Sequence, residues 1–461
     1  MNWQLLATAM LPEHILLAGI VALVVMALVS DDARGALAVS LVAVAAAAAA
    51  AAWLHFGGVA ASPFPGQVAV SPAISAAKAI VLALALPVLL MSRDDFDGDE
   101  RFHTLLLASL YGFCLLVSSD SFLTLFLGLE LMSLPVYVLV LIAFKRPESV
   151  EAALKYLVLG GAASATLLMG ISLLFGATGS MALTTFSKAL ASHDTMAVAG
   201  VALVTIAFFL KAAIVPFHAW APDAYEGASI PVTAYMSTAI KAGVLLTAAR
   251  LFSTAPVPWT VATMIAILPL VSIVWGNLTA MKQVSFRRMI AYSSIAHAGY
   301  LFYAFLGDGA GRFQAVVFYL LAYGLMNLLA FAAIPPGDDA TRDRLENLKG
   351  LWHREPYAAL AIGMAMLSLA GIPPFPGFVA KFLIFKNVIA AGYTTYAVLG
   401  LVGSYLGIYF YLRVIQFMFM SPQEAVAGGA APRRVAVAAS VVCLIPVVLL
   451  ALFPGWVLGL F

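Results

Sequence analysis

The stretch SFLTLFLGLELMSLPVYVLVLIAF, residues Ser121–Phe144, decides the fold class of this chain. A helix needs about 20 mostly apolar residues to cross the hydrocarbon core of a membrane. This stretch has that length, and its one charged residue, Glu130, stands about ten residues after its start. At a rise of about 1.5 Å per residue, Glu130 is expected near the middle of the membrane. The stretch therefore predicts a transmembrane helix that carries a carboxylate at membrane depth.

The composition of the whole chain agrees with this reading. Of the 461 residues, 63% are hydrophobic and only 10% are charged, whereas about 25% are charged in a soluble domain. The mean hydropathy is +1.02. A soluble globular domain, a disordered chain and a nucleic-acid binder are thereby excluded. The two cysteines, Cys114 and Cys443, lie in apolar runs, so we expect no disulfide framework, no metal site and no redox centre in this chain.

The length criterion predicts an all-α polytopic membrane protein with about fourteen transmembrane helices. The expected spans are His14–Ser30, Ala36–His55, Ala77–Met91, Phe102–Val117, Ser121–Phe144, Ala152–Phe175, Met196–Val215, Ile230–Phe252, Trp259–Met281, Ile290–Leu306, Phe313–Ile334, Tyr357–Lys386, Tyr396–Met420 and Arg434–Leu458. No strand pattern is found, and no glycine-rich phosphate loop follows one, so a nucleotide site is not expected.

Lysine and arginine in the loops indicate the orientation, because cytoplasmic loops carry an excess of both. Loops that join an odd span to the next even one hold fourteen of them: Arg34, Arg93, Arg101, Lys145, Arg146, Lys282, Arg287, Arg288, Arg342, Arg344, Lys349, Arg354, Arg433 and Arg434. Loops of the other parity hold four: Lys188, Arg250, Arg312 and Lys386. This asymmetry predicts that both termini lie outside the cytoplasm.

Six basic residues remain inside the expected spans. Lys78 and Arg413 lie toward span ends, where their side chains are expected to reach the headgroups. The other four are the lysines Lys155, Lys211, Lys241 and Lys381. Among the carboxylates, Glu130 is expected to be the one that lies inside a span. A charge at membrane depth costs at least about 2.5–3.5 kcal/mol, so each of these residues requires an explanation.

A structural ion pair is one interpretation of these charges, in which Glu130 and a lysine hold two helices in register. One carboxylate cannot neutralise four lysines, however. A lysine without a partner in a low-dielectric bundle can lose its proton near neutral pH, whereas an arginine cannot. The lysines therefore favour proton transport. His218 and His297 are the two histidines placed to take part in such a relay.

Two of the expected spans are interrupted by proline. Pro216 interrupts the seventh, and the segment Pro373–Gly377 interrupts the twelfth, five spans later. Paired interruptions of this kind indicate an inverted-repeat transporter, and repeats of five helices must be inverted because five is odd. We expect a three-helix N-terminal segment (residues 1–100), two inverted five-helix repeats (101–253 and 254–420) and a C-terminal helix (421–461).

Several motifs resemble the antiporter-like subunits of respiratory complex I. They are Gly128–Pro135 with Glu130, Leu154–Lys155–Tyr156 with Gly160–Gly161, Phe209–Lys211 and Pro216–Asp223, Gly276–Ala280, Arg287–Tyr300, and Leu369–Pro374. Together they extend over roughly residues 122–412. Within the family, Lys381 and the single span after the repeats resemble one of the three subunits. Of the other two, one is expected to carry a glutamate in place of Lys381 and one a long lateral helix.

The resemblance implies a role for each candidate residue. Glu130 and Lys211 would form a pair whose separation switches the proton affinity of the lysine, and Lys155 would bias proton entry or that pair. Lys241 would be the central relay, and Lys381 would release the proton toward the outer side. His218 and His297 would link the lysines through ordered water.

The resemblance also implies a setting for the chain. It would be a proton-translocating subunit of NADH–quinone oxidoreductase in the bacterial inner membrane, packed against sister antiporter-like subunits and lipid. Partner chains would carry FMN and iron–sulfur clusters, with quinone as the acceptor, so this chain would bind no cofactor or metal. Two alternatives stay open: a subunit of a multisubunit Na⁺/H⁺ antiporter or membrane-bound hydrogenase, and a non-conducting membrane scaffold.

Overall fold

A computed structural model describes residues 3–29, 35–93, 95–96, 99–143, 147–192, 194–252, 259–307, 311–335, 343–421 and 434–459. Several residues used in the orientation argument lie outside these ranges: Arg34, Lys145, Arg146, Arg342 and Arg433. Ser30 and Phe144, each the expected last residue of a span, lie outside them as well.

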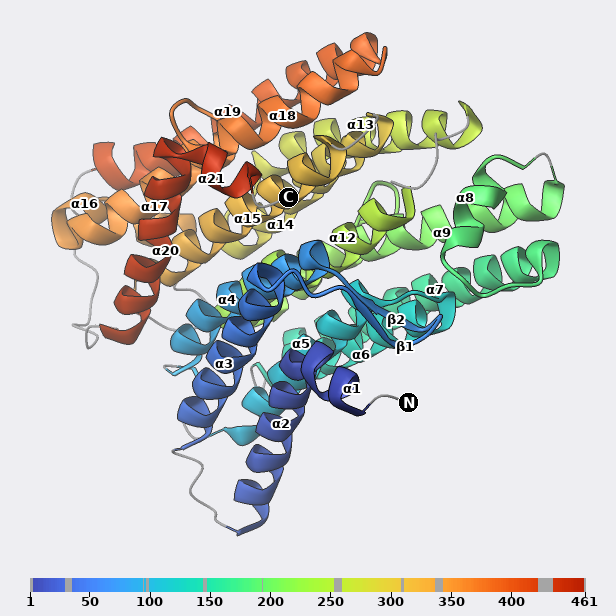
Figure 1. Cartoon of the computed structure of the whole chain (residues 1–461). Helices are drawn as coiled ribbons and strands as arrows, with labels where there is room; N and C mark the ends of the chain where they lie inside the picture. The colour runs from blue at the N-terminus through green and yellow to red at the C-terminus, as the bar shows by residue number, and fades with distance from the viewer. Residues whose placement is uncertain are drawn as a thin grey trace.

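The described chain is almost entirely helical (Figure 1). Its α-helices are α1 (Trp3–Ala9), α2 (Leu11–Val29), α3 (Ala36–Phe56), α4 (Pro72–Ser92), α5 (Glu100–Ser118), α6 (Phe122–Ile142), α7 (Pro147–Thr178), α8 (Thr184–Leu190), α9 (Thr195–Ala212), α10 (Trp220–Gly227), α11 (Ile230–Tyr235), α12 (Lys241–Phe252), α13 (Trp259–Ala280), α14 (Phe286–Tyr303), α15 (Gly311–Ala332), α16 (Leu351–Arg354), α17 (Pro356–Ala370), α18 (Pro376–Ala390), α19 (Thr394–Met420), α20 (Arg434–Leu452) and α21 (Pro454–Leu458). A π-helical turn, η1 (Met236–Ile240), joins α11 to α12, and two 3₁₀ turns are η2 (Ala304–Leu306) and η3 (Leu345–Leu348).

The expected membrane spans are confirmed. In the described part of the chain, 13 helices are long and apolar enough to cross a membrane. The twelfth expected span is the exception by length, because it is broken into α17 and α18, of 15 residues each. The chain is therefore an all-α polytopic membrane protein.

A short β-hairpin contradicts the expectation that the chain has no strand. Strand β1 (Ala61–Phe64) pairs antiparallel with β2 (Val68–Val70) between α3 and α4. Strands of four and three residues are too short to show the alternation that identifies a strand in sequence. Gln67, at the turn, accepts hydrogen bonds from the hydroxyls of Ser121 (2.6 Å) and Thr124 (2.9 Å), which fixes the hairpin to the start of α6.

Helix α12, which begins at Lys241, lies in the middle of the protein (Figure 1). The span formed by α11, η1 and α12 is completely buried in protein, and α14 and α15 nearly so. By contrast, α2, α3, α19 and α20 leave most of their surface uncovered. The last long helix, α20, returns to pack on α4 and α15, so it contacts the N-terminal segment.

The two proline-containing breaks close in the same way. Helix α9 ends at Ala212 and is capped by Ala213 (φ +61°), where the N–H groups of Ala213 and Ile214 donate to the carbonyls of Leu210 and Phe209. Helix α17 ends at Ala370 and is capped by Gly371 (φ +84°), where the N–H groups of Gly371 and Ile372 donate to the carbonyls of Ser368 and Leu367. Both are left-handed C-caps that satisfy the last carbonyls of a helix. The matching caps support the predicted five-helix repeats.

Candidate functional site

A buried ion pair joins α6 to the end of α9. The Nζ of Lys211 lies 3.1 Å from Oε1 of Glu130, and the two side chains are 6% and 18% exposed. The hydroxyl of Ser164, on α7, donates to the same carboxylate oxygen. The Lys211 ammonium also lies 3.5 Å from the hydroxyl of Tyr137. Three helices thus meet at one carboxylate, and Lys211 occupies the C-terminal turn of α9, where a cation is favoured by the helix dipole.

An aromatic stack links this pair to the segment after the first break. Trp220, the first residue of α10, stacks on Tyr156 with ring centroids 4.4 Å apart. Tyr156 in turn meets Tyr137 edge to face at 4.5 Å. The indole N–H of Trp220 donates to the carbonyl of Leu210 at 2.9 Å, just before the break. The position of α10 is therefore tied to the surroundings of Lys211.

Lys241 stands directly after the π-helical turn η1 and has neutral partners. Its Nζ donates to the carbonyl of Ser294 at 2.5 Å and also contacts the Ser294 hydroxyl. It lies 5.6 Å from the centre of the Tyr323 ring. Tyr225 on α10 shares the Ser294 hydroxyl at 3.3 Å. Among the described residues, no carboxylate is in ion-pair contact with Lys241.

Lys381 lies on α18, just after the second break. Its Nζ donates to the carbonyl of Ala370 (3.0 Å), at the end of α17, and to the hydroxyl of Ser404 (3.1 Å) on α19. The ring of Tyr300 lies 5.1 Å away. A Cβ on Gly371 would stand 3.0 Å from Cδ of Lys381, so glycine makes room for the lysine as well as for the cap. A pocket of about 490 Å³ between α18 and α19 opens onto Lys381.

His297 lies in the region between Lys241 and Lys381, surrounded by tyrosines. Its Nδ1 is 2.8 Å from the hydroxyl of Tyr319, and its Nε2 is 3.2 Å from the hydroxyl of Tyr411. The Tyr411 hydroxyl is also 2.5 Å from that of Ser293, the neighbour of the Lys241 partner Ser294. Both imidazole nitrogens are thus bonded to groups that can donate and accept a proton. The sequence did not single out these tyrosines, because a tyrosine is uncharged and its presence in a span requires no explanation.

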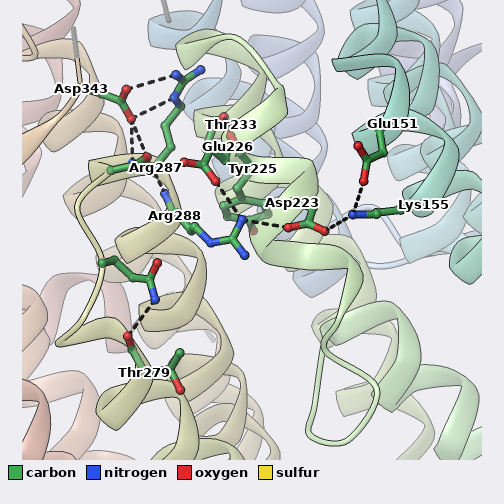
Figure 2. A network of polar contacts seen from close by, with 12 residues as sticks. Glu151, Lys155, Asp223, Tyr225, Glu226, Thr233, Thr279, Arg287, Arg288 and Asp343 are labelled. Carbon is green, nitrogen blue, oxygen red and sulfur yellow. Dashed lines mark hydrogen bonds and ion pairs between the residues drawn. The ribbon is translucent and has the colours of Figure 1, made fainter. Parts of the chain in front are cut away.

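Lys155 is not part of the buried set, and the expectation that it is a buried, unbalanced lysine is wrong. Its side chain is 44% exposed and pairs with Glu151 and Asp223, each at 2.7 Å (Figure 2). Helix α7 has 32 residues and is about 48 Å long, which exceeds the hydrocarbon core. Lys155 therefore reaches the polar end of its helix.

The ion pairs of Lys155 continue into the second half of the protein (Figure 2). Asp223 and Glu226 on α10 both accept from Arg288 on α14, at 2.8 Å each. The adjacent Arg287 pairs with Asp343 at 3.0 Å. Burial of Asp343 raises the pKa of its carboxyl, but the charge and hydrogen bonds of Arg287 outweigh that effect and hold the pKa below its usual value. This network connects α7, α10, α14 and the segment before η3.

The remaining candidates are placed as follows. His218 lies in the first break, where its Nε2 accepts from the indole N–H of Trp275 at 3.2 Å; within the described chain its ring is not in hydrogen-bond contact with a lysine. Arg413 donates to the carbonyl of Met281 (2.8 Å), near the end of α13. In the described ranges, no cluster of three or more His, Cys, Asp or Glu side chains is placed to hold a metal ion.

One expectation about a charged side chain near a span end is wrong. Lys78 does not reach toward headgroups, because it is fully buried in an ion pair with Glu13. Glu13 lies in the first turn of α2, at the end of a span as expected, but its carboxylate is buried rather than exposed. Helix α2 begins before the expected first span, and the packing of α2 on its neighbours buries the carboxylate.

This arrangement, a polytopic helical protein with lysines buried beside two broken helices, defines a membrane subunit of the antiporter-like class. Residues 119–407 match the family described as NADH:quinone oxidoreductase/Mrp antiporter, transmembrane, and the chain belongs to this family.

Individual proteins indicate which members of this family the chain resembles. The chain is 36% identical over 419 residues to NADH-quinone oxidoreductase subunit N of Pelobacter propionicus, an alignment that covers 90% of each chain. It is also similar to a chain in the structure of respiratory complex I from Thermus thermophilus, with a TM-score of 0.83, 35% identity, and 97% and 98% of the two chains covered. A chain of the Mrp complex from Dietzia sp. has a TM-score of 0.83 at 24% identity, with 98% and 96% covered, and shares the fold. The resemblance to antiporter-like subunits of complex I is therefore confirmed.

Proposed function

We propose that this chain is a proton-translocating membrane subunit of an NADH–quinone oxidoreductase, corresponding to subunit N. The observation that carries the proposal is the pair of buried lysines, Lys241 and Lys381, whose ammonium groups contact carbonyls and hydroxyls. The region between them is occupied by hydroxyl groups and the His297 imidazole, which can pass protons. A scaffold requires no such groups, since apolar packing would hold the same helices together.

The proposed mechanism begins at the Glu130–Lys211 pair. With Glu130 close, Lys211 keeps its proton; when the carboxylate moves away, the proton affinity of the lysine falls and the proton passes on. The stack of Trp220, Tyr156 and Tyr137 gives α10 a means to sense or drive that separation. Lys155, through Asp223 on α10, biases this step from the polar end of α7.

The proton then passes from Lys241 toward Lys381. On one side, Lys241 contacts the Ser294 hydroxyl, which is also hydrogen-bonded to Tyr225. The region beyond is occupied by Tyr411, His297 and Tyr319. His218 joins through ordered water at the first break. Lys381 releases the proton toward the outer side through the pocket between α18 and α19.

The energy for this cycle comes from quinone reduction in partner chains, which hold the FMN and iron–sulfur clusters; this chain itself binds no cofactor. It works in a hetero-oligomer with the other complex I membrane subunits and its antiporter-like sisters. The location is the bacterial inner membrane, with both termini on the periplasmic side. The excess of lysine and arginine in loops of one parity supports that orientation.

The test is proton pumping in inside-out membrane vesicles, with NADH-driven acidification and NADH oxidation recorded together. Lys241→Met removes the charge at similar volume, and Lys241→Arg keeps the charge but cannot release its proton. Both are expected to lower the number of protons pumped per NADH in an assembled complex. Lys282→Met, at an exposed position before α14, is the matched control. Unchanged pumping per NADH in both Lys241 variants would contradict the proposal.

A further inference from the structure

A second buried Glu–Lys pair lies in the N-terminal segment, outside the residues matched by the family. The Nζ of Lys78 on α4 is 2.5 Å from Oε1 of Glu13 on α2, and both side chains are 1% exposed. The matched region begins at residue 119. None of the roles proposed above uses this pair.

The hydrogen-bonding groups at the Glu13–Lys78 pair do not all have partners. Within the described chain, the second carboxylate oxygen of Glu13 (Oε2) is buried and has no hydrogen-bond partner. The hydroxyl of Ser75, one turn before Lys78 on α4, is likewise buried and without a partner in that part of the chain. Among the described residues, Tyr111 and Cys114 on α5 are titratable side chains close enough to Glu13 for its charge to act on them. A carboxylate oxygen that accepts no hydrogen bond has lone pairs that can accept a proton.

A purely structural link between α2 and α4 does not explain why Glu13 and Lys78 are there. Two charges removed from water lose their solvation, and well-packed apolar side chains of similar volume hold helices together at least as well. An acceptor left unsatisfied in the interior adds to the cost. Ionisable groups that persist in a membrane interior despite this cost generally take part in ion or proton transport.

The helix that carries Lys78 packs against the turn that precedes Lys241. Helix α4 packs against both α11 and the π-helical turn η1, which ends at the residue before Lys241. Leu84, about 9 Å further along α4 than Lys78, and Thr238 of η1 both lie within 4 Å of the position that a Cβ on Gly324 would take. Isolated π-turns in helices are frequent at functional sites. A change of charge at Lys78 can therefore reach the helix that positions the central lysine.

We propose that Glu13 and Lys78 form a second proton-binding site, which takes up one proton and releases it during the transport cycle. In the resting pair, Lys78 is the ammonium and Glu13 the carboxylate. Proton uptake converts the carboxylate to the acid, leaves the ammonium in place and breaks the ion pair; release restores it. The role in the transport cycle rests on the proposed function, whereas binding of the proton itself does not.

Infrared difference spectroscopy on the purified complex tests proton binding directly. Spectra recorded at two pH values, and with and without NADH, are expected to contain a carboxylic-acid C=O band that Glu13→Gln removes and Glu13→Asp shifts. Because Glu13→Asp keeps the charged pair, it serves if Glu13→Gln does not assemble. If neither variant alters a band in either pair of spectra, Glu13 does not exchange a proton and the proposal is overturned.

Pumping separates this site from the proposed function. The double variant Glu13→Gln/Lys78→Met removes both charges, so it leaves no unpaired ion and is expected to assemble but to pump fewer protons per NADH. The surface pair Asp99–Arg101 (2.8 Å), neutralised as Asp99→Asn/Arg101→Gln, is the matched control. If Lys241→Met stops pumping while the double variant pumps like the parent, the pair is only structural and the proposed function stands. If the parent itself does not pump with NADH, the proposed function fails, and the pH-induced spectra still decide whether Glu13 binds a proton.

Discussion

Lys241 donates to the backbone carbonyl of Ser294 with 2.5 Å between Nζ and the oxygen, and it touches the hydroxyl of the same residue. Lys211, by contrast, is held by the Glu130 carboxylate. A carboxylate stabilises the charged lysine by Coulomb attraction, whereas a carbonyl and a hydroxyl offer only dipoles. The two lysines are therefore suited to different roles, with Lys211 responding to the position of a charge and Lys241 passing a proton onward.

Neutralising one member of the Glu130–Lys211 pair is expected to cost both stability and pumping. Glu130→Gln leaves Lys211 buried without its counter-ion, which costs about 3–5 kcal/mol. The double variant Glu130→Gln/Lys211→Met removes the unpaired charge, so thermal stability of the extracted complex is expected to recover while proton pumping does not. Recovery of pumping together with stability would show that the pair is structural. Glu148→Gln, at an exposed position on α7, is the control.

Tyr411→Phe is expected to slow pumping without changing the fold. The variant removes the hydroxyl that contacts both His297 and Ser293, and leaving these buried partners unpaired costs about 1–3 kcal/mol. Pumping per NADH in vesicles is the measurement. Tyr409→Phe, on the same helix but 61% exposed, is the matched control. Equal effects of the two substitutions would exclude a specific role for Tyr411.

Two adjacent glycines on α7 are expected to respond oppositely to alanine. A Cβ on Gly160 would stand 2.1 Å from the hydroxyl of Tyr137, whereas a Cβ on Gly161 would meet nothing within 4 Å. Gly160→Ala must displace Tyr137 from beside Lys211, at a cost of about 1–3 kcal/mol in packing. Gly161→Ala is expected to be neutral or to stabilise the helix by about 0.5–1 kcal/mol. Thermal unfolding of the extracted complex measures both, and a Gly160→Ala protein as stable as the parent would contradict this geometry.

The pair of Arg287 and Asp343 is expected to stabilise the protein except in strong acid. The pKa of Asp343 is lowered from its usual 3.8, because Arg287 outweighs the effect of burial. A lowered pKa contributes stability above the unfolded value, and that stability is lost as the pH falls through the folded value. The difference in thermal stability between the parent and Asp343→Asn is thus expected to be constant near neutrality and to shrink in acid, from about pH 5 downward. A difference that grows on acidification would mean that the sign of the shift is wrong.

Much of the fold is predictable because a membrane permits only a few backbone structures to span it. The spans were found from runs of apolar residues, and the breaks at Pro216 and Pro373–Gly377 from the chemistry of proline. The interior position of Lys241 follows from the same count, since a residue in the middle of a span lies in the middle of the membrane, whereas Lys211 and Lys381 were identified by the breaks beside them. These are local properties, and each depends on only about 20 residues of sequence.

Pairing between helices could not be read in this way. Lys78 stands near the end of its span and so resembles a residue that reaches the headgroups, and Glu13 resembles the start of a helix; only the packing of α2 on α4 makes them a buried pair. Lys155 is the opposite case, because it was expected to be buried and the length of α7 leaves its side chain exposed.

The sequence by itself determined that this chain is a polytopic helical membrane protein with interior lysines beside two broken helices, since hydrophobic length and proline act locally. Only the tertiary structure decided which groups those lysines meet. It placed a carboxylate at Lys211, the carbonyl and hydroxyl of Ser294 at Lys241, and tyrosines on both nitrogens of His297. The physical reason is that a hydrogen bond forms over about 3 Å between atoms, and helices far apart in sequence supply both of its ends.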